Sequence, residues 1–463
     1  MKRFLYMLLA VSMLTMPTSC GDITEINNDP TRLSEVNLSL MAPIVLAGHY
    51  RNEGSNPTRV AGIIMQQYVG FDAQQVDYTQ YFIGEDAMNN YWRTGLYAGS
   101  LKDAIVMIEK AQEEGNTFYS ALGKLILANG IADAASYFGD IPFSEAFKGT
   151  ENLKPAYDSQ ESVYSAVQGL LDEAIAEFKE NAGGHLGGDL VFGGDTDAWV
   201  KTAYALKARY LMHLQKRQSV EADVLNFLDQ SLTSMADEAT FTFGTAETEN
   251  WTLAKFGRER PNTLVFNPGF ASRLEATSDP RLNNYAKFDG TSWQYWVLGD
   301  ADLIWGKDNA AIPLVSFAEV SFLRAEALLR SGAGDAEVEA AFQAGIQASM
   351  DLVGIPADDA AAYIAANGSL SGSTEAKLEQ IMNEAYIAYY GHNFHQTWAN
   401  YRRTGYPALT PNPNGTSGLN PSGVIPRRFL YVGSETQTNG VNVQAARDRQ
   451  NGALLDAPVW AFQ

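Results

Sequence analysis

The 463-residue sequence contains one cysteine, Cys20, and no long apolar run follows it. A single cysteine cannot form a disulfide within its own chain, so the folded state must be stabilised by burial of the core. The composition is sufficient for this, because 46% of the residues are hydrophobic and Tyr and Phe occur 22 times each. No later window approaches the run of about 18 apolar residues that a membrane-spanning helix needs. We therefore expect a large soluble body.

Basic residues are also few. The 33 Lys and Arg are outnumbered by 54 Asp and Glu, which gives a formal net charge of −21. A surface of this sign repels phosphate backbones. Nucleic acid is therefore not expected among the partners of this protein.

The cysteine lies at the end of an N-terminal leader. Two basic residues precede an apolar run over 4–16, which is typical of a secretory signal and too short to span a bilayer. Small residues precede Cys20, although Pro17 stands where lipoprotein signals usually carry an aliphatic residue. We predict a signal peptide over 1–19, lipid attachment at Cys20 and an acidic tether over 20–36. The alternative is a signal peptide cut nearby and a free surface thiol.

Helical periodicity dominates the chain beyond the tether. Apolar residues recur at steps of three and four, which places them on one face of each expected helix. Two consecutive pairs are formed by Tyr97, Leu101, Ala104, Ile108 and Ala111, then Ala121, Leu125, Ala128, Ala132 and Ala135, and by Tyr164, Val167, Leu171, Ala174 and Phe178, then Trp199, Ala203, Leu206 and Tyr210. A third pair is indicated over 316–330 and 338–352, and a final long helix over about 374–403. We predict a mainly α-helical scaffold of tetratricopeptide-like hairpins, although no repeat carries the full signature.

Two segments lack this period. Residues 241–315 are rich in turn formers and hold four of the eight tryptophans, whereas 404–434 is rich in Pro, Gly and Asn. Buried irregular backbone would leave polar groups unpaired, so the loops of 404–434 are expected on the surface. The prediction is a single α-helical domain over 37–463 with a loop-rich insertion over about 241–315.

Two aromatic clusters are candidates for ligand binding. The first is Trp293, Tyr295, Trp296 and Trp305 in the irregular segment, and the second is Tyr78 and Tyr81. Indole faces stack on the apolar faces of sugar rings, and nearby Asn, Gln and Asp can bond hydroxyl groups. The alternative for the first cluster is that strand alternation places Trp293 and Tyr295 on one side and Trp296 in the core. Interior packing or contact with a partner protein explains the second cluster equally well.

Charged residues form no recognisable catalytic or metal motif. His392 and His395 are three apart, but they lack the glutamate of a zinc peptidase. Acidic residues near position 300 could bind calcium, yet Asp300 and Asp302, with Asp289 and Asp308 nearby, do not have calcium-loop spacing. The other histidines have no Ser or Cys partner in a nucleophile motif. We therefore predict no catalytic residue, no metal and no cofactor.

Paired arginines have two interpretations. Arg402 and Arg403 could hold an anion through their guanidinium forks, because these bind carboxylate and phosphate bidentately. We favour a structural role in closing a helix C-terminus, where free carbonyls need donors. The same interpretation applies to Arg427 and Arg428.

Four segments, taken in chain order with the leader, resemble a known family. They are FGDIPFSEAF over 138–147, SDPRL over 278–282, WANYRRTGYP over 398–407 and IPRRFLY over 425–431. In the first segment, Gly139 is expected to take the left-handed cap conformation at a helix end. Together these segments resemble the SusD/RagB family of nutrient-binding outer-membrane lipoproteins. One departure is Val432, where relatives often carry proline.

The resemblance implies a lipid-anchored protein of the outer membrane, exposed at the cell surface, with a tetratricopeptide-like core. Such a protein captures an oligosaccharide or a peptide and delivers it to a SusC-like TonB-dependent barrel. The resemblance implies no hydrolysis. Two other interpretations stay open, namely an outer-membrane glycoside hydrolase and a repeat adaptor that binds only protein.

Substitution of the cysteine tests the predicted anchor. Each acyl chain contributes about 0.8 kcal/mol per buried methylene, and stable attachment takes more than one membrane-binding element, so Cys20→Ala should release the body from the membrane. Fractionation after high-salt and carbonate washing should recover the variant as soluble or unprocessed protein. A mature variant that stays in the membrane fraction would contradict the prediction.

Overall fold

The computed structural model describes residues 36–296, 300 and 302–463. The predicted signal peptide over 1–19 lies outside the described residues, and so does the predicted tether except for Val36. Residues 38–463 form one unit by their contacts, and all described helices and strands belong to it.

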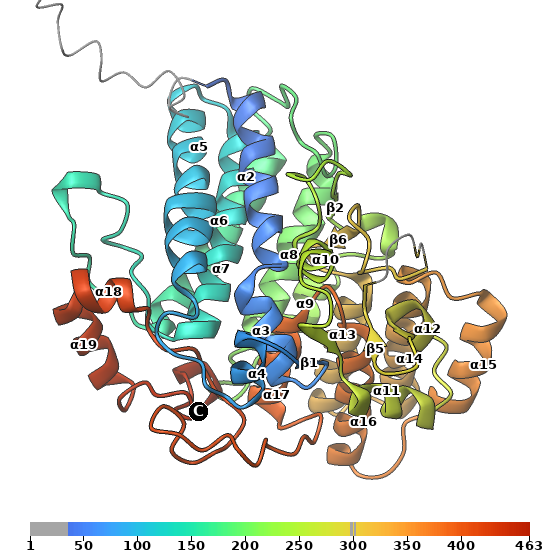
Figure 1. Ribbon diagram of the computed structural model, residues 1–463. Helices are drawn as coiled ribbons and strands as arrows, with labels where there is room; N and C mark the ends of the chain where they lie inside the picture. Colours follow the sequence, from blue (N-terminus) through green and yellow to red (C-terminus); the bar gives the residue numbers. More distant parts are fainter. Residues whose placement is uncertain (1–35, 297–299, 301) are drawn as a thin grey trace, which may run out of the picture. The chain divides into compact units, whose positions relative to one another are not determined.

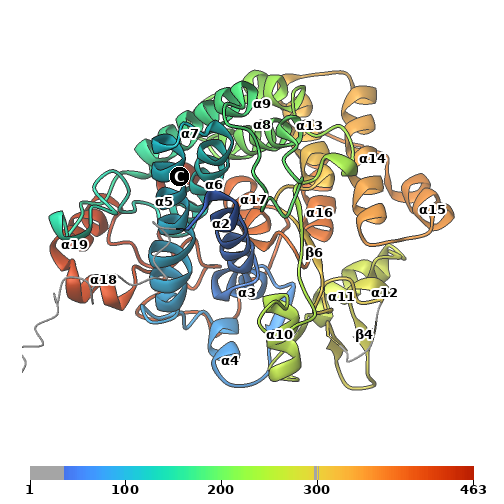
Figure 2. The same ribbon diagram turned by 90° about the horizontal axis from the view of Figure 1, so that it is seen from above.

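The first half of this unit consists of long helices that pack against their neighbours in the chain (Figure 1). Their bounds are Leu38–Glu53 (α2), Asn56–Ile64 (α3), Gln74–Thr79 (α4), Tyr91–Ser100 (η3, a π-helix), Leu101–Glu113 (α5), Thr117–Phe138 (α6), Gly149–Glu151 (η4), Gln160–Glu180 (α7), Thr196–Met212 (α8), Glu221–Leu228 (α9) and Met235–Asp237 (η5). Contacts join α5 to α6, α6 to α7 and α7 to α8, and α2 packs on α5 and α6. Figure 2 views these helices end-on. The first two predicted helix pairs are therefore confirmed as α5–α6 and α7–α8. The exception is Tyr97, which lies in η3 and is separated from α5 by the non-helical Gly99.

Side-chain caps mark the starts of α6, α7 and α8. The Asn116 side chain accepts a hydrogen bond from the Tyr119 backbone N–H at 3.2 Å, at the start of α6. The Asp195 carboxylate accepts from two backbone N–H groups at the start of α8. Such caps satisfy amide groups that have no partner within the helix. They favour the observed starts of these three helices.

The central helix α6 is buried along almost its whole length. Its predicted alanine stripe is confirmed, but the other faces are buried as well, as expected for a helix surrounded by others. Two glycines allow close approach of α5. A Cβ atom on Gly123 would lie 2.6 Å from Ile108 Cγ1, and one on Gly130 would lie 2.7 Å from Leu101 Cδ2.

The middle of the chain contains short elements. The helices are Thr252–Glu259 (α10), Pro268–Ala276 (α11) and Leu282–Tyr285 (α12), and the strands of the unit are Tyr68–Gly70 (β1), Thr240–Thr242 (β2), Leu264–Phe266 (β3), Lys287–Phe288 (β4), Trp293–Gln294 (β5) and Ala311–Pro313 (β6). Three antiparallel pairs join β1 to β3, β2 to β6 and β4 to β5. The loss of long helical periodicity over 241–315 thus reflects short helices and strand pairs.

The last part of the chain returns to helices. Their bounds are Phe317–Ser331 (α13), Asp335–Leu352 (α14), Ala357–Asn367 (α15), Thr374–Ala388 (α16), Phe394–Thr404 (α17), Gly433–Thr438 (α18), Gly440–Arg449 (α19) and Trp460–Phe462 (η6). The hairpin of α13 and α14 confirms the third predicted pair, and α13 also packs on α9 and α16.

Buried arginines connect three of the four quoted segments. The Arg402 guanidinium donates to the backbone carbonyls of Ser136 and Arg427. Arg428 donates to the carbonyl of Phe138, and the Trp398 indole N–H donates to the carbonyl of Pro426 at 2.9 Å. The segments around 138, 398 and 425 therefore meet at the C-terminal end of α6. This arrangement supports the structural role favoured for Arg402 and Arg428.

Gly139 ends α6, but not in the expected conformation. Its φ of +80° is positive as predicted, whereas its ψ of −116° lies outside the left-handed helical region. A Cβ atom there would lie 1.9 Å from the Gln450 side-chain oxygen, which itself accepts a hydrogen bond from Arg428. Glycine is required because the backbone turns sharply and because α19 approaches it closely.

The loops of 404–434 are not all on the surface, so that prediction is wrong for their last part. Ile425 and Phe429 are buried without forming a helix or strand. Their neighbours' backbone groups are bonded by other parts of the chain, because Phe429 N–H donates to Tyr137 O and Arg427 N–H donates to Leu455 O. Hydrogen-bond partners from distant parts of the chain thus satisfy backbone groups that would otherwise need water.

The SDPRL segment forms a separate buried ion cluster. Arg281 donates to both oxygens of Asp279, to Glu384 Oε2 at 2.9 Å on α16, and to Ser349 Oγ at 3.1 Å on α14. The Arg281 and Asp279 side chains have no exposed surface. Arg403 similarly pairs with buried Glu326 of α13. Breaking either group would leave an unpaired buried charge, which is strongly destabilising.

The predicted long helix over 374–403 is wrong, because the chain is broken between α16 and α17. Gly391 has a φ of +85°, which no residue within a right-handed helix adopts. The break also accommodates Trp305, whose ring lies against the ring of His392 with centroids 4.8 Å apart. A Cβ atom on Gly391 would lie 2.0 Å from Trp305 Cδ1. Distant packing therefore decides where this helix stops.

Alanine substitutions at two glycines separate backbone strain from this contact. Gly405 also has a φ of +85°, but its Cβ position is open, so Gly405→Ala should cost about 1 to 2 kcal/mol in the free energy of unfolding. Gly391→Ala should cost about 1 to 3 kcal/mol more, because it also displaces Trp305. Chemical denaturation of both variants measures the difference. Equal losses of unfolding free energy in the two variants would contradict the prediction. They would show that the packing of Trp305 does not require the absence of a side chain at Gly391.

Candidate functional site

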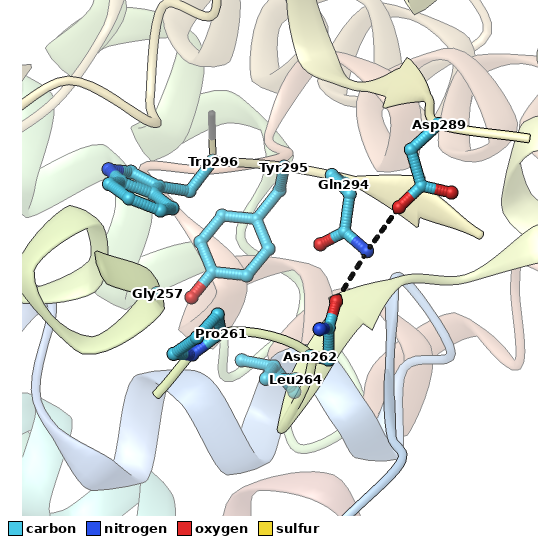
Figure 3. A pocket seen from close by; sticks show the side chains of 8 residues that line it. All are labelled: Gly257, Pro261, Asn262, Leu264, Asp289, Gln294, Tyr295 and Trp296. Carbon is cyan, nitrogen blue, oxygen red and sulfur yellow. Dashed lines mark hydrogen bonds between the residues drawn. The ribbon is translucent and has the colours of Figure 1, made fainter. Parts of the chain in front are cut away.

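A cavity of about 250 Å³ opens where the middle segment folds back on itself (Figure 3). The lining residues come from α10, from the chain leading into β3, and from the β4–β5 hairpin with the two residues that follow it; they are Gly257, Pro261, Asn262, Leu264, Asp289, Gln294, Tyr295 and Trp296. The cavity combines apolar walls with a row of polar side chains. Such a combination is typical of small-ligand sites.

Hydrogen bonds fix the polar side of this cavity. The Gln294 side-chain amide donates to Asn262 Oδ1 at 2.9 Å and to Asp289 Oδ2 at 3.3 Å, as the dashed lines in Figure 3 show. The other oxygen of Asp289 accepts from the backbone N–H groups of Ser292 and Thr291 in the hairpin turn. These bonds lower the pKa of Asp289. The row therefore presents a charged acceptor and two amides with further hydrogen-bonding capacity.

Two aromatic residues form the opposite side. Tyr295 is 2% exposed, its hydroxyl lies 3.3 Å from Leu253 O, and its ring packs on Tyr68. Burial raises the pKa of Tyr295, so the hydroxyl stays protonated and acts as a donor. Trp296 is only half-buried. Of these two rings, that of Trp296 is the one with surface to offer a ligand.

Gly257 makes this arrangement possible. A Cβ atom there would lie 2.8 Å from the Tyr295 hydroxyl and 2.9 Å from Trp296 Cβ. Any side chain at this position would push the aromatic residues out of the cavity wall. Gly257 therefore has a packing role that no sequence pattern indicates.

The other two tryptophans of the first cluster lie outside the cavity lining. Trp293, on β5, is half-buried and packs against Phe288 and Phe266 at 5.5 and 6.4 Å between ring centroids. Trp305 is 2% exposed and fills the break beside Gly391. The packing of Trp305 indicates a core role. Trp293 instead packs against Phe288 in the hairpin and stabilises it. The suggested alternation places Trp296 in the core, but in the structure Tyr295 is the buried residue.

The second predicted cluster, near α4, is also buried. Tyr78 and Tyr81 are 1% and 2% exposed, and the Tyr81 hydroxyl accepts a hydrogen bond from Asn412 N–H at 3.0 Å. Their neighbours Phe71 and Phe82 are 58% and 44% exposed instead. Packing therefore accounts for both tyrosines in this structure, and a role in ligand binding stays a prediction.

The acidic and histidine groups singled out in the sequence have other partners. Asp308 pairs with Arg258, and Asp302 lies 3.5 Å from the Lys287 ammonium. The two ring nitrogens of His395 face Glu53 and Asp133 at 3.5 and 3.4 Å. Within the described ranges, no group of three His, Cys, Asp or Glu side chains could hold a metal ion.

Sequence reasoning missed part of the cavity. Asn262, Pro261 and Gly257 precede the aromatic run by about 30 residues, and no local pattern links them to it. Contact between β3 and β5, together with the hydrogen bond from Gln294 to Asn262, joins these segments. Gln294 and Asp289 were visible as polar neighbours of the tryptophans, and this nearness was the available signal.

A protein-family model described as "Starch-binding associating with outer membrane", of the SusD-like type, matches residues 27–432. The chain belongs to the SusD-like family. No curated protein matches its sequence.

Solved structures with the SusD-like fold superpose over nearly the whole chain. A SusD/RagB family protein from Bacteroides thetaiotaomicron is 25% identical, with a TM-score of 0.73 and coverage of 92% of this chain and 98% of the other. A SusD homologue from Bacteroides fragilis is 22% identical, with a TM-score of 0.75 and coverage of 93% and 100%. A chitin-binding protein is also 22% identical, with a TM-score of 0.77 and coverage of 92% and 99%. These matches confirm the predicted mainly α-helical SusD-like fold.

Membership places the chain in an outer-membrane-associated family of starch- and nutrient-binding proteins. The family consists of binding proteins rather than enzymes. None of the helices in the described part of the chain is long and apolar enough to cross a membrane.

Proposed function

We propose that this protein binds an oligosaccharide in the cavity between α10 and the β4–β5 hairpin. The observation that carries the proposal is the half-buried Trp296 ring opposite the hydrogen-bonded row of Asn262, Gln294 and Asp289. An indole face suits the apolar face of a sugar ring, and the amides and carboxylate suit its hydroxyl groups. The starch-binding description of the family supports a glycan over a peptide.

The same geometry favours binding over hydrolysis. Glycoside hydrolases use two carboxyl groups on either side of the scissile bond. Among the residues that the structure describes, the cavity lining contains one carboxylate, Asp289, and its oxygens accept bonds from Gln294 and from the hairpin backbone. A fixed, ionised acceptor of this kind positions a ligand and is unsuited to act as a general acid.

The proposal extends to a route of uptake. We infer that the protein is held at the cell surface by lipid on Cys20 and passes its ligand to a SusC-like TonB-dependent barrel. The leader, the single cysteine and family membership support this inference. The interface with the barrel should be at least of standard size, on the order of 1,600 Å² in total, because a lid must cover a wide pore.

Truncation of Trp296 tests the binding site. If a sugar ring stacks on this indole, Trp296→Ala should weaken binding by about tenfold to a hundredfold, which corresponds to roughly 1 to 3 kcal/mol. Calorimetric titration of the wild type against starch oligosaccharides, chitin oligosaccharides and short peptides selects the ligand, and the variant is then titrated with it. The melting temperature should change little, because Trp296 is only half-buried.

Phe288→Ala is the matched control for this experiment. Phe288 lies on the same hairpin and is 57% exposed, but it does not line the cavity. Its truncation should leave affinity unchanged. Unchanged affinity in the Trp296 variant, or equal losses in both variants, would move the binding site away from this cavity.

Isolation of the protein from its membrane tests the partnership. Affinity purification from detergent-solubilised outer membranes should recover a large TonB-dependent barrel together with this protein. The Cys20→Ala variant serves as a comparison, since it separates contact with the barrel from co-extraction through the membrane. Recovery of the protein alone, under conditions that preserve such complexes, would contradict the proposed partnership.

A further inference from the structure

A second cavity, of about 190 Å³, lies beside the loop that follows α6. It is lined by Trp92, Tyr97, Pro142, Ala146, Phe147, Pro155 and Glu435. Its residue Glu435 belongs to α18, which lies far from α10, an element of the first cavity, in both views of the molecule (Figures 1 and 2). This cavity is therefore separate from the proposed oligosaccharide site, with which it shares no lining residue.

The aromatic walls of the second cavity are held rigidly. The Trp92 and Tyr97 ring centroids are 4.8 Å apart, and the Phe147 ring stacks near Tyr97 at 5.7 Å with an interplanar angle of 19°. The Tyr97 hydroxyl donates to Pro142 O at 2.7 Å, and Trp92 packs edge-on against Phe138 of α6. Fixed rings of this kind lose little side-chain entropy when a ligand binds.

One carboxylate lines this aromatic cavity. Glu435 is half-buried and accepts a hydrogen bond from the Tyr157 hydroxyl at 3.1 Å. The arginines of the adjacent α19 are engaged elsewhere, because Arg447 pairs with Glu85 and Arg449 with Asp140. No described basic side chain forms an ion pair with Glu435. The negative charge is thus available to a ligand.

The half-buried Tyr97 and Phe147 rings, and a carboxylate without an ion pair, match a cationic ligand. A cation over an aromatic face is attracted by the ring quadrupole, and a nearby carboxylate adds a charge-assisted hydrogen bond. The first cavity differs, because two neutral amides accompany its carboxylate Asp289. We propose that the second cavity binds the side chain of a lysine or arginine from another polypeptide.

The dimensions agree with this occupant. The cavity volume is several times the share of about 30 Å³ that one water occupies in the liquid, so it holds more than an ordered solvent molecule. Prolines 142 and 155 and Ala146 supply apolar surface for the methylene groups of a long side chain. The charged end then reaches Glu435 while the stem contacts the rings, which is how Lys and Arg side chains commonly bury themselves.

Short peptides provide the test. The probes are acetyl-Gly-Lys-Gly-amide, its arginine counterpart, and its norleucine counterpart, which keeps the length of lysine but lacks the charge. Titrations followed by NMR at one fixed ionic strength should show the lysine and arginine peptides binding at least fivefold more tightly than the norleucine peptide. Glu435→Gln should abolish this difference, because glutamine keeps the shape and the Tyr157 bond but not the charge.

Two further variants make the outcome decisive. Glu151→Gln removes one exposed negative charge from the chain outside the cavity lining, so it should leave the preference for cations intact. Phe147→Ala should weaken all three peptides by a similar factor of about fivefold, because it removes a ring that contacts the stem. Equal affinity for the lysine and norleucine peptides in the wild type overturns the proposal. An equal loss of preference in the Glu151 variant, or no binding at millimolar peptide, also overturns it.

Discussion

The C-terminal end of α6 imposes the constraint on which the rest of the structure depends. The last carbonyl groups of a helix have no partner within it, and α6 is too deeply buried for water to serve. Arg402 and Arg428 supply the missing donors from 266 and 290 residues further along the chain. The C-terminal part of the chain must therefore pack against the end of α6 before the last carbonyl groups of α6 have hydrogen-bond donors.

This solution has an electrostatic cost. Burial lowers the pKa of Arg402 to about 9, and it lowers that of Arg428 as well. Each guanidinium donates to backbone carbonyls, and Arg402 also lies over the Trp398 ring at 4.1 Å. The guanidinium of Arg402 stays charged at neutral pH, since 9 is still above 7. Carbonyl oxygens at a helix C-terminus and an aromatic face together offset part of the desolvation of such groups.

Local periodicity made most helices predictable, because each buried face repeats within a few residues. The break between α16 and α17 was not predictable in this way, since Trp305 arrives there from outside the helix. Burial of the segment around Phe429 was missed for the same reason, because its backbone partner Tyr137 lies in α6. In the candidate site, the aromatic run was found from its composition. Its polar partner Asn262 and Gly257 were not, because only tertiary contacts between separate segments bring them near.

The packing of Trp305 against Gly391 has a consequence for motion. The residue after Trp305, Gly306, lies against the cavity wall, because a Cβ atom there would lie 2.3 Å from Tyr295 O and 3.2 Å from Trp296 Cα. The indole itself sits in the joint between two core helices. Movement of Trp305 and Gly306 away from the cavity wall requires withdrawal of the indole, which would leave a void in the joint. The cavity wall and the helix joint should therefore fluctuate as one cooperative unit. Slow amide hydrogen exchange in one would then be matched by similarly slow exchange in the other.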